Sequence, residues 1–313
     1  MAVMTINASS TPIAASSPIG FIGIGNMGFA MMARLLSQGW TVYVHDIDPE
    51  RMKQAAALGA KPTASPADIA LQCRICFIVV VDAQQVERVL WGPMALLSQS
   101  KSGDVVYLCP TLGPLDVEKA AALAKAKGVH LIDSPMSGGP VRAREGQMSL
   151  MLSGDLAEMT KHEALLNAIT QHRFLISPKP GDAAKTKLAN NLLAAINLAG
   201  ASEVLAMAQS WGLDAHTTLQ VMQSSSGQSW IGRDRMERAL QNDFAPRAHT
   251  SLLAKDTRLA VEACQHLEVA VPALGHLASQ QFAKACDLGF KDQDDASLFL
   301  VAGGKPIKPS ERV

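Results

Sequence analysis

The sequence has no excess charge of either sign and no long apolar run. Its 313 residues include 28 Lys and Arg against 28 Asp and Glu, so the formal net charge is zero and the pI is near 7.1. A protein without a basic surplus lacks the electrostatic footprint typical of nucleic-acid binding or of attachment to an anionic membrane. The longest strongly apolar stretch, Ile75–Val81, has seven residues, far fewer than a membrane-spanning helix requires. Both classes of protein are therefore disfavoured.

Cysteine is also scarce, with five residues in no pattern typical of a disulfide framework. Cys73 and Cys76 form a CxxC motif, but no second Cys or His pair stands nearby to complete a zinc site. We therefore expect buried thiols. The first 17 residues are rich in Ala, Ser and Thr and lack the basic and apolar segments of a signal peptide. We expect a flexible leader at residues 1–17 and a cytoplasmic location.

From Ile19 onward, short apolar runs alternate with amphipathic segments. Strands are predicted at Ile19–Ile24, Thr41–His45, Cys76–Val81, Val105–Cys109, His130–Asp133, Ser149–Leu152 and Phe174–Ile176. Helical spacing occurs between them, at Phe29–Gln38, Pro66–Gln72, Val86–Leu97 and Pro114–Lys127. This alternation predicts parallel βαβ units, and hence an α/β fold with an N-terminal Rossmann domain, a doubly wound parallel sheet.

The breaker cluster Pro178–Gly181 predicts a domain boundary, with the Rossmann domain at 18–180 and an all-α domain at 181–313. Lys185–Trp211 can form one long inter-domain helix closed by Gly212, and further helices follow to about Leu288 without convincing strands. A helix that is apolar all round is normally buried, here between domains or against another subunit. A homodimer or homotetramer is therefore expected.

A glycine-rich segment after the first strand has the GxGxxG spacing, at Gly23, Gly25 and Gly28. Gly23 permits a tight turn, Gly25 lets a pyrophosphate approach the backbone, and Gly28 lets the helix pack closely on the strand. The free N–H groups at the helix start then face the phosphates. Asp46 ends the next strand, where an acid can bind the adenosine ribose hydroxyls and would repel a 2′-phosphate. We expect NAD as cofactor because no Arg directly follows Asp46, and NADP is the less favoured alternative, since Arg51 lies close in the sequence. The domain at 18–180 is then the NAD-binding domain, and the all-α domain at 181–313 is expected to serve the substrate and oligomerisation.

Two further segments carry candidate chemistry. Ser137–Gly139 places backbone N–H groups beside a hydroxyl, which suits a carboxylate, although an ordinary loop is an equal alternative. Lys187 and Asn191 are four residues apart and share one helix face. A lysine on a largely apolar helix is costly unless its ammonium is paired, deprotonated or in a cleft. The alternative is a lysine that snorkels at the helix start, which fits Lys185.

Together these segments resemble the β-hydroxyacid dehydrogenase family over roughly Ile19–Leu300. The shared motifs are GFIGIGNMG near the start, DSPMSGGPVRAREGQM in the middle, KLANN on the long helix and LLAKD at Leu252–Asp256. Four motifs in the same order are more specific than any one of them. The final region is most similar to the sugar-acid branch around L-threonate dehydrogenase, through SSSGQSW at Ser224–Trp230, DFAPR at Asp243–Arg247 and DQDDAS at Asp292–Ser297.

The resemblance implies roles for individual residues. Lys187 matches the family's catalytic lysine, and Asn191 matches the asparagine that orients it and the substrate. Lys255 matches the lysine near the nicotinamide and substrate, and Asp256 is expected to be structural. The segment that binds the substrate carboxylate is then Ser137, Gly138 and Gly139. The cofactor-binding residues are expected to be Gly23, Gly25, Asn26, Met27, Gly28, Asp46, Thr111 and Lys255, and no metal is expected.

The implied enzyme is an NAD-dependent oxidoreductase that transfers a hydride between nicotinamide and a small hydroxy acid. The acid is a 3-hydroxy acid or a four-carbon sugar acid such as L-threonate. Lys187 would accept the hydroxyl proton in oxidation and return it in reduction, with its pKa lowered toward neutrality by partial burial and by Lys255. The alternatives are a 2-hydroxy-3-oxopropionate (tartronate semialdehyde) reductase, an imine reductase, a 6-phosphogluconate dehydrogenase and a non-catalytic dinucleotide-binding scaffold. Pro110, Met136 and Ala183 depart from the family's usual residues.

Overall fold

The computed structural model describes residues 17–306, so the leader expected at 1–17 lies outside the described residues except for Ser17. The chain divides into two compact units, Met1–Lys187 and Leu188–Val313. This division falls inside helix α9 (Asp182–Ser210). The domain boundary expected at 180/181 stays a prediction.

The first unit is built on a nine-stranded sheet with the order β3-β2-β1-β4-β5-β6-β8-β7, and β9 pairs with β8. From β3 to β6 the strands are parallel and follow the order of a dinucleotide-binding Rossmann domain, which confirms the predicted fold class. The strands are β1 (Ile19–Ile22), β2 (Val42–His45), β3 (Lys61–Pro62), β4 (Ile75–Ile78), β5 (Val105–Leu108), β6 (His130–Asp133), β7 (Met136–Ser137), β8 (Met148–Ser153) and β9 (Thr170–Ser177).

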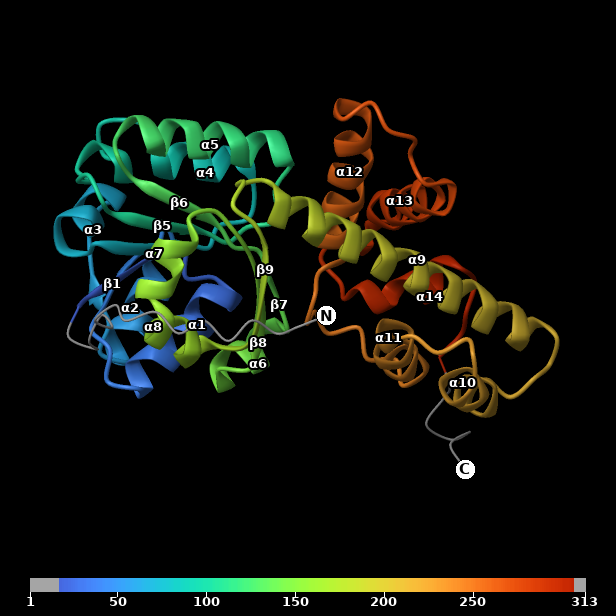
Figure 1. The fold of residues 1–313 in the computed structure, drawn as a ribbon. Coiled ribbons are helices and arrows are strands. Elements are labelled where there is room, and N and C mark those ends of the chain that lie inside the picture. Colours follow the sequence, from blue (N-terminus) through green and yellow to red (C-terminus); the bar gives the residue numbers. More distant parts are fainter. Residues whose placement is uncertain (1–16, 307–313) are drawn as a thin grey trace. The chain divides into compact units, whose positions relative to one another are not determined.

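Helices cover both faces of this sheet (Figure 1). On one face, the core contains residues of α1 (Asn26–Ser37), α6 (Gly139–Glu145), α7 (Leu156–Lys161) and α8 (Glu163–Ile169). On the other, it contains residues of α3 (Pro66–Gln72), α4 (Ala83–Leu90), η1 (Leu96–Ser98) and α5 (Pro114–Ala126). Alternate strand residues enter the two cores because side chains along a strand point to opposite faces. On the first face, Phe77 stacks between Phe21 and Tyr107, with ring centroids 5.1 and 4.8 Å apart.

The structure corrects two predictions in this unit. The sheet is not parallel throughout, because β8 runs antiparallel to both β6 and β7. An apolar run such as Ser149–Leu152 does not encode strand direction, and β7 has only two residues, too few to show a period. The helix predicted at Val86–Leu97 ends at Leu90, because Gly92-Pro93 follows and a short 3-10 turn replaces the rest.

The described part of the second unit is helical, as predicted. Its core contains Leu198 and Leu205 of α9 together with Met236, Phe282 and Phe299. The long helix predicted at Lys185–Trp211 is confirmed as α9, and Gly212 follows it with a φ of +81°. The helices after α9 are α10 (Ala215–Ser224), α11 (Trp230–Leu240), α12 (Thr250–His266), α13 (Ala273–Ala285), η2 (Cys286–Phe290), η3 (Asp295–Ser297) and α14 (Leu298–Val301).

Helix α9 is long and apolar enough to cross a membrane by length and composition. Its most apolar window of 18 residues has a mean hydropathy of 1.4, and 44% of that window is buried within the protein. The helix contains no long unbroken apolar run, because Asn, Gly and Ser interrupt it. A core helix of a soluble protein passes the same test, so the finding is weak evidence for a membrane span.

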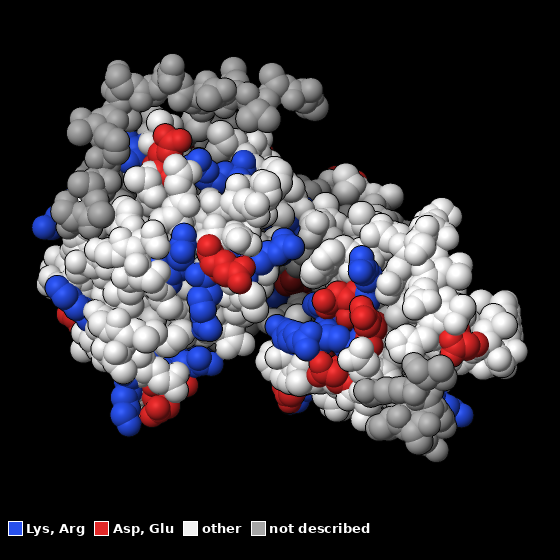
Figure 2. All heavy atoms as spheres, turned by 90° about the horizontal axis from the view of Figure 1, so that it is seen from below, with Lys and Arg blue, Asp and Glu red and all other residues white. Residues whose placement is uncertain are grey.

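The balance of charges in the sequence is also seen on the surface. In the view of Figure 2, basic and acidic side chains of the described residues are interspersed, and several stand beside one another.

Cys73, Cys76 and Cys109 are buried free thiols, as predicted for the CxxC pair. Burial raises the pKa of the Cys73 thiol to about 12 and that of Cys76 well above its ordinary value. These thiols therefore stay protonated and are poor nucleophiles or metal ligands at neutral pH.

Candidate active site

The candidate residues of the first unit follow the carboxyl ends of its parallel strands. The GxGxxG segment comes after β1, Thr111 comes three residues after β5, and Ser137 lies shortly after β6. Carboxyl ends of parallel strands meet at one edge of a sheet, which is where open α/β folds bind ligands. The strand order reverses between β1 and β4, so the glycine segment lies at this switch point.

The three glycines of the phosphate loop have three different surroundings. Gly23 has a φ of +87°, and a Cβ there would lie 2.6 Å from the carbonyl oxygen of Val79. A Cβ on Gly28 would lie only 2.1 Å from the Gly23 carbonyl oxygen, so helix α1 packs directly on the loop. A Cβ on Gly25 would meet nothing within 4 Å, and Gly25 is exposed. The loop is thus closed on the protein side and open where a pyrophosphate would approach, which fits a dinucleotide.

Asp46 is held against this loop. Its Oδ2 accepts a hydrogen bond from the Ile24 N–H at 2.6 Å, and its Oδ1 accepts one from the Asp48 N–H at 2.9 Å. Arg51 also reaches the loop, because its Nη2 donates to the Asn26 Oδ1 at 3.1 Å. An acid and a cation therefore both lie at the start of α1, although the sequence assigned the cofactor contact to the acid.

A substitution at Gly25 separates cofactor binding from folding. We expect Gly25→Ala to leave the Tm unchanged, since Gly25 has a φ of −61° and open space around it. The added methyl group occupies the space expected for the pyrophosphate, so NADH affinity should fall on the order of tenfold, which corresponds to about 1.4 kcal/mol. Fluorescence titration with NADH measures this. The control is Gly200→Ala on α9, also with nothing within 4 Å, which should leave NADH affinity unchanged.

The Ser137–Gly139 segment is not the loop that the sequence allowed. Met136 and Ser137 form β7, paired with β8, and Gly139 begins α6. Gly138 and Gly139 have φ angles of +127° and +70°, in the region that disfavours other residues. The two glycines let the chain turn from strand into helix beside the Ser137 hydroxyl, so their backbone N–H groups occupy a fixed turn.

Lys187 lies near the start of α9 and is buried, with 8% of its surface exposed. The start of α9 is anchored by Asp133 at the end of β6. The Asp133 Oδ2 accepts hydrogen bonds from the N–H groups of Gly181 and Ala184, both at 2.9 Å. Lys185 instead is half-buried and pairs with Asp182 at 2.8 Å, as expected for an ordinary lysine at a helix start.

In the second unit, Asp256 joins two of the candidate residues. Its Oδ2 accepts a hydrogen bond from the Asn191 Nδ2 at 2.6 Å. Its Oδ1 lies 3.3 Å from the Lys255 Nζ. Asp256 is buried at 6% exposure and sits on α12 with Lys255. The family resemblance gave Asp256 a structural role, and the structure specifies it: Asp256 orients the Asn191 amide and pairs with Lys255.

The candidate residues thus form two groups, one in each compact unit. The first unit holds the phosphate loop, Asp46, Thr111, Ser137–Gly139 and Lys187, and the second holds Asn191 and Lys255. Lys187 and Asn191 lie four residues apart on α9, which continues through the boundary between units.

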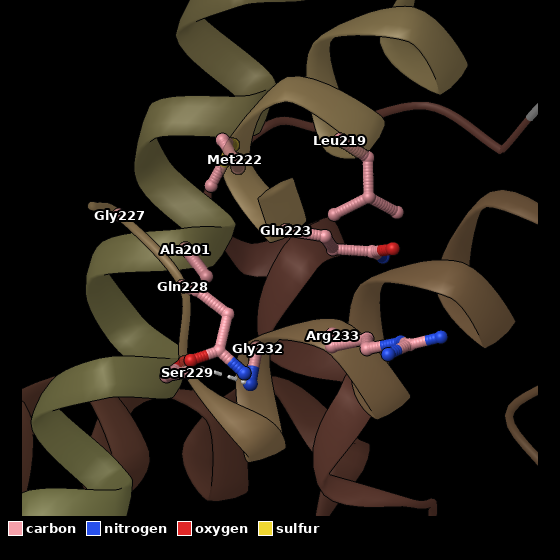
Figure 3. Close-up of a pocket in the computed structure, with 9 residues that line it drawn as sticks. All are labelled: Ala201, Leu219, Met222, Gln223, Gly227, Gln228, Ser229, Gly232 and Arg233. Atoms are coloured by element: carbon pink, nitrogen blue, oxygen red, sulfur yellow. Dashed lines mark hydrogen bonds between the residues drawn. The ribbon is translucent and has the colours of Figure 1, made fainter. Parts of the chain in front are cut away.

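A cluster of possible metal ligands and a pocket lie apart from these candidate residues in the sequence. Ligand atoms of His130, Asp155 and Glu158 lie within 4.8 Å of one another, but Lys161 already pairs with Glu158 at 2.5 Å. This ion pair already partly neutralises the Glu158 carboxylate. A pocket in the second unit is drawn in Figure 3 and lies between α9, α10 and α11. Its lining residues are Ala201, Leu219, Met222, Gln223, Gly227, Gln228, Ser229, Gly232 and Arg233.

Comparison with known proteins decides the family. The model of the NAD binding domain of 6-phosphogluconate dehydrogenase matches residues 18–177, and that of the NAD-binding domain of NADP-dependent 3-hydroxyisobutyrate dehydrogenase matches residues 181–301. An L-threonate dehydrogenase of Cupriavidus necator is 31% identical over 92% of this chain and 97% of its own length. The chain belongs to the β-hydroxyacid dehydrogenase family.

Other β-hydroxyacid dehydrogenases agree with this assignment. A 2-(hydroxymethyl)glutarate dehydrogenase of Eubacterium barkeri is 32% identical over 91% of this chain and 95% of its own length. The crystal structure of a 3-hydroxyisobutyrate dehydrogenase from Salmonella typhimurium has a TM-score of 0.83 and 28% identity, covering 91% of this chain and 100% of that one. The chain is therefore an NAD(P)-dependent dehydrogenase of the CH–OH class, in the branch that resembles L-threonate dehydrogenase, as the sequence motifs predicted.

Proposed function

We propose that this dehydrogenase oxidises a small hydroxy acid, with a four-carbon sugar acid such as L-threonate as the first candidate and a 3-hydroxy acid as the second. The observation that carries the proposal is the buried Lys187 in the first turns of α9. A buried lysine is costly as a cation, and a general acid–base role explains its place. The likeness to L-threonate dehydrogenase from Cupriavidus necator supports the choice of acid.

In this proposal, the substrate carboxylate binds the Ser137 hydroxyl and the backbone N–H groups of Gly138 and Gly139. The bound cofactor supplies the hydride chemistry. The Lys187 Nζ accepts the proton of the substrate hydroxyl during oxidation and returns it during reduction. Asn191 orients Lys187 and the substrate, and Asp256 fixes the Asn191 amide by their hydrogen bond of 2.6 Å. Thr111 and Lys255 would contact the nicotinamide end of the cofactor, and no metal is needed.

Three finer statements belong to the same proposal. The domains are a Rossmann domain at 18–180 and a helical domain at 181–313, the protein is cytoplasmic, and it forms a homodimer or homotetramer. Exposed apolar residues on α9, Leu193, Val204 and Met207, support self-association. A 2-hydroxy-3-oxopropionate reductase is the alternative within the same chemistry, and it differs only in the substrate that fits the site.

Cofactor preference depends on Asp46. We expect Asp46→Asn to raise kcat/KM with NADP relative to NAD by about tenfold or more, because the Asp46 carboxylate no longer repels a 2′-phosphate. The Asn oxygen can still accept the hydrogen bond from Ile24. Arg51, held at Asn26, would supply a cation for the phosphate. Steady-state kinetics with both cofactors measure the ratio. Asp48→Asn removes the same charge at an exposed helix cap and should leave the ratio unchanged.

The substrate is tested by cofactor reduction at 340 nm. The panel is L-threonate, D-erythronate, D-glycerate, 3-hydroxyisobutyrate and 3-hydroxypropionate, each with NAD and NADP. Turnover of one acid with a clearly higher kcat/KM names the substrate. Turnover of none, by a protein that binds NADH tightly, would favour the non-catalytic scaffold.

A further inference from the structure

One buried carboxylate of the first unit has no part in the proposed reaction and lies between two of its segments. Asp133 is the last residue of β6, with 1% of its surface exposed. Four residues later the chain reaches Ser137, the first residue of the proposed carboxylate segment. The Asp133 side chain, however, contacts residues about fifty positions further along the chain, at the start of α9.

Asp133 supplies the cap that α9 cannot supply for itself. The first N–H groups of a helix have no partner within the helix, and a side chain at the preceding residue usually accepts one of them. The residue before α9 is Gly181, which has no side chain and a φ of +100°. The Asp133 Oδ2 takes this place by accepting hydrogen bonds from Gly181 N–H and Ala184 N–H.

Ser153 completes the cap from β8. Its hydroxyl donates to the Asp133 Oδ2 at 3.1 Å, and its oxygen accepts a hydrogen bond from the Ala183 N–H at 3.1 Å. Three backbone N–H groups at the start of α9, those of Gly181, Ala183 and Ala184, are therefore held by two buried side chains from the sheet. Lys187 follows Ala184 by three residues, less than one helical turn. A helix is stiff over this length, so the position of Ala184 sets that of the Lys187 backbone.

We propose that Asp133, together with Ser153, is a positioning residue for the reaction, which fixes the first turn of α9 on the sheet and thereby places Lys187. The inference rests on the proposed function, because it assumes that Lys187 transfers the proton. Asp133 itself touches neither substrate nor cofactor in this account. Because it also ends the strand that leads to Ser137, one residue links the segment that binds the substrate carboxylate to the helix that carries the base.

The charge of Asp133 is compatible with this role. Burial raises the pKa of the carboxyl to about 6, while hydrogen bonds from Ala184, Gly181 and Ser153 oppose that rise. The group is therefore largely ionised at neutral pH. Its Oδ1 is buried and has no hydrogen-bond partner among the described residues. All three hydrogen bonds that Asp133 accepts end on Oδ2, so an Asn could make the same contacts through its side-chain oxygen.

The test compares three variants in the full-length protein. In Asp133→Ala the cap is lost, and kcat for the preferred hydroxy acid should fall on the order of 10²-fold, the effect of misplacing a catalytic group by about 1 Å. KM for the acid should change much less, and NADH affinity should stay the same because the phosphate loop is not altered. Asp133→Asn keeps an acceptor oxygen and should recover most of the lost kcat. Ser153→Ala should give an intermediate loss and serves if Asp133→Ala does not fold.

Asp104 offers a matched control. It is also a buried Asp of the first unit, paired with Arg74 at 2.6 Å, but it lies before β5 at the opposite end of the sheet. Asp104→Asn should lower the Tm and leave kcat unchanged. Amide hydrogen exchange supplies a readout without turnover: in Asp133→Ala, exchange should accelerate at residues 181–187 and not in the phosphate loop.

The two proposals fail in different ways. A wild-type protein that reduces no cofactor with any acid overturns the proposed function and this inference with it. An active wild type whose Asp133→Ala and Ser153→Ala variants keep their kcat overturns this inference alone. So does a loss of kcat that Asp104→Asn reproduces at the same Tm, or an unchanged exchange rate at residues 181–187.

Discussion

Replacing Lys187 with Ala should lower kcat for the preferred hydroxy acid on the order of 10²–10⁴-fold, the range typical of general acid–base catalysis. The side chain is buried, so no other described residue is expected to take over its proton transfer without moving. NADH affinity should be unchanged, because in the proposed function the loop at Gly23–Gly28, and not Lys187, binds the cofactor phosphates. The measurement is steady-state kinetics at 340 nm in both directions, with NADH binding followed by fluorescence.

The neighbouring lysine is the matched control for this variant. Lys185 lies two residues earlier on the same helix and pairs with Asp182 at 2.8 Å. Lys185→Ala should keep kcat within about twofold of wild type, since this half-buried pair lies outside the proposed proton transfer. Lys187→Arg keeps the positive charge but removes the proton transfer, because an arginine does not release its proton at ordinary pH. Activity in Lys187→Ala equal to that of Lys185→Ala would remove Lys187 from the mechanism.

The second large effect is expected on stability, in the second unit. Replacing Asp294 with Ala should destabilise the protein by about 3–5 kcal/mol, the cost of breaking a buried ion pair by removing one partner. Asp294 is fully buried and accepts hydrogen bonds from the Arg238 guanidinium and the Arg247 N–H, both at 2.8 Å. The carboxylate also accepts from the N–H groups of Ala248 and Ala296. Its loss leaves the Arg238 charge buried and these backbone groups unpaired.

The pH dependence of the free energy of unfolding tests the same carboxyl group. Burial alone would raise the pKa of Asp294, but Arg238 and the backbone N–H donors outweigh it and lower the pKa to about 2. A carboxyl whose folded pKa lies below its unfolded value stabilises the fold above the unfolded value of about 3.9, and this contribution is lost as pH falls through the folded value. Urea unfolding between pH 5 and pH 2 should show this loss in wild type and not in Asp294→Ala.

An exposed acid in the same segment is the control. Asp292 has 78% of its side chain exposed and lies 4.0 Å from Lys291. Asp292→Ala should change the free energy of unfolding by less than about 0.5 kcal/mol. An Asp294→Ala variant as stable as Asp292→Ala would show that the buried network of Asp294 does not hold the second unit together.

The parts of the fold that depend on local sequence could be predicted. β6 and α3 have the predicted bounds, because an apolar run and a capped Ser65-Pro66 start specify them locally. The tight turn at Gly23 and the close packing at Gly28 could also be predicted, since each follows from its place between a strand and a helix. The role of Gly25 in binding a pyrophosphate stays a prediction. The sequence motifs that pointed to the sugar-acid branch, DFAPR and DQDDAS, turn out to contain Arg247 and Asp294, whose contact connects two loops of the second unit.

The parts that depend on distant contacts could not be predicted. Asp133 meets Gly181 and Ala184 across 48 and 51 positions, and no local pattern indicates which oxygen caps which helix. Asp256 accepts a hydrogen bond from Asn191, which lies 65 positions earlier in the chain. Its part in orienting the Asn191 amide could therefore not be predicted from the adjacent Lys255 and Asp256 alone. The turn of Ser137–Gly139 into α6 was missed because two glycines and a proline look like a loop, although Pro at the first turn of a helix is common.

Direct hydride transfer from a hydroxy acid to the cofactor is the central claim, and isotope transfer tests it most directly. Wild-type protein is mixed with NAD and with L-threonate deuterated at C2 or at C3, and the NADH formed is examined by proton NMR. We expect deuterium at C4 of the nicotinamide from one of the two labelled acids, which also identifies the hydroxyl that reacts. Reduced cofactor without deuterium from either acid, or no reduced cofactor from any acid of the panel, would contradict the account.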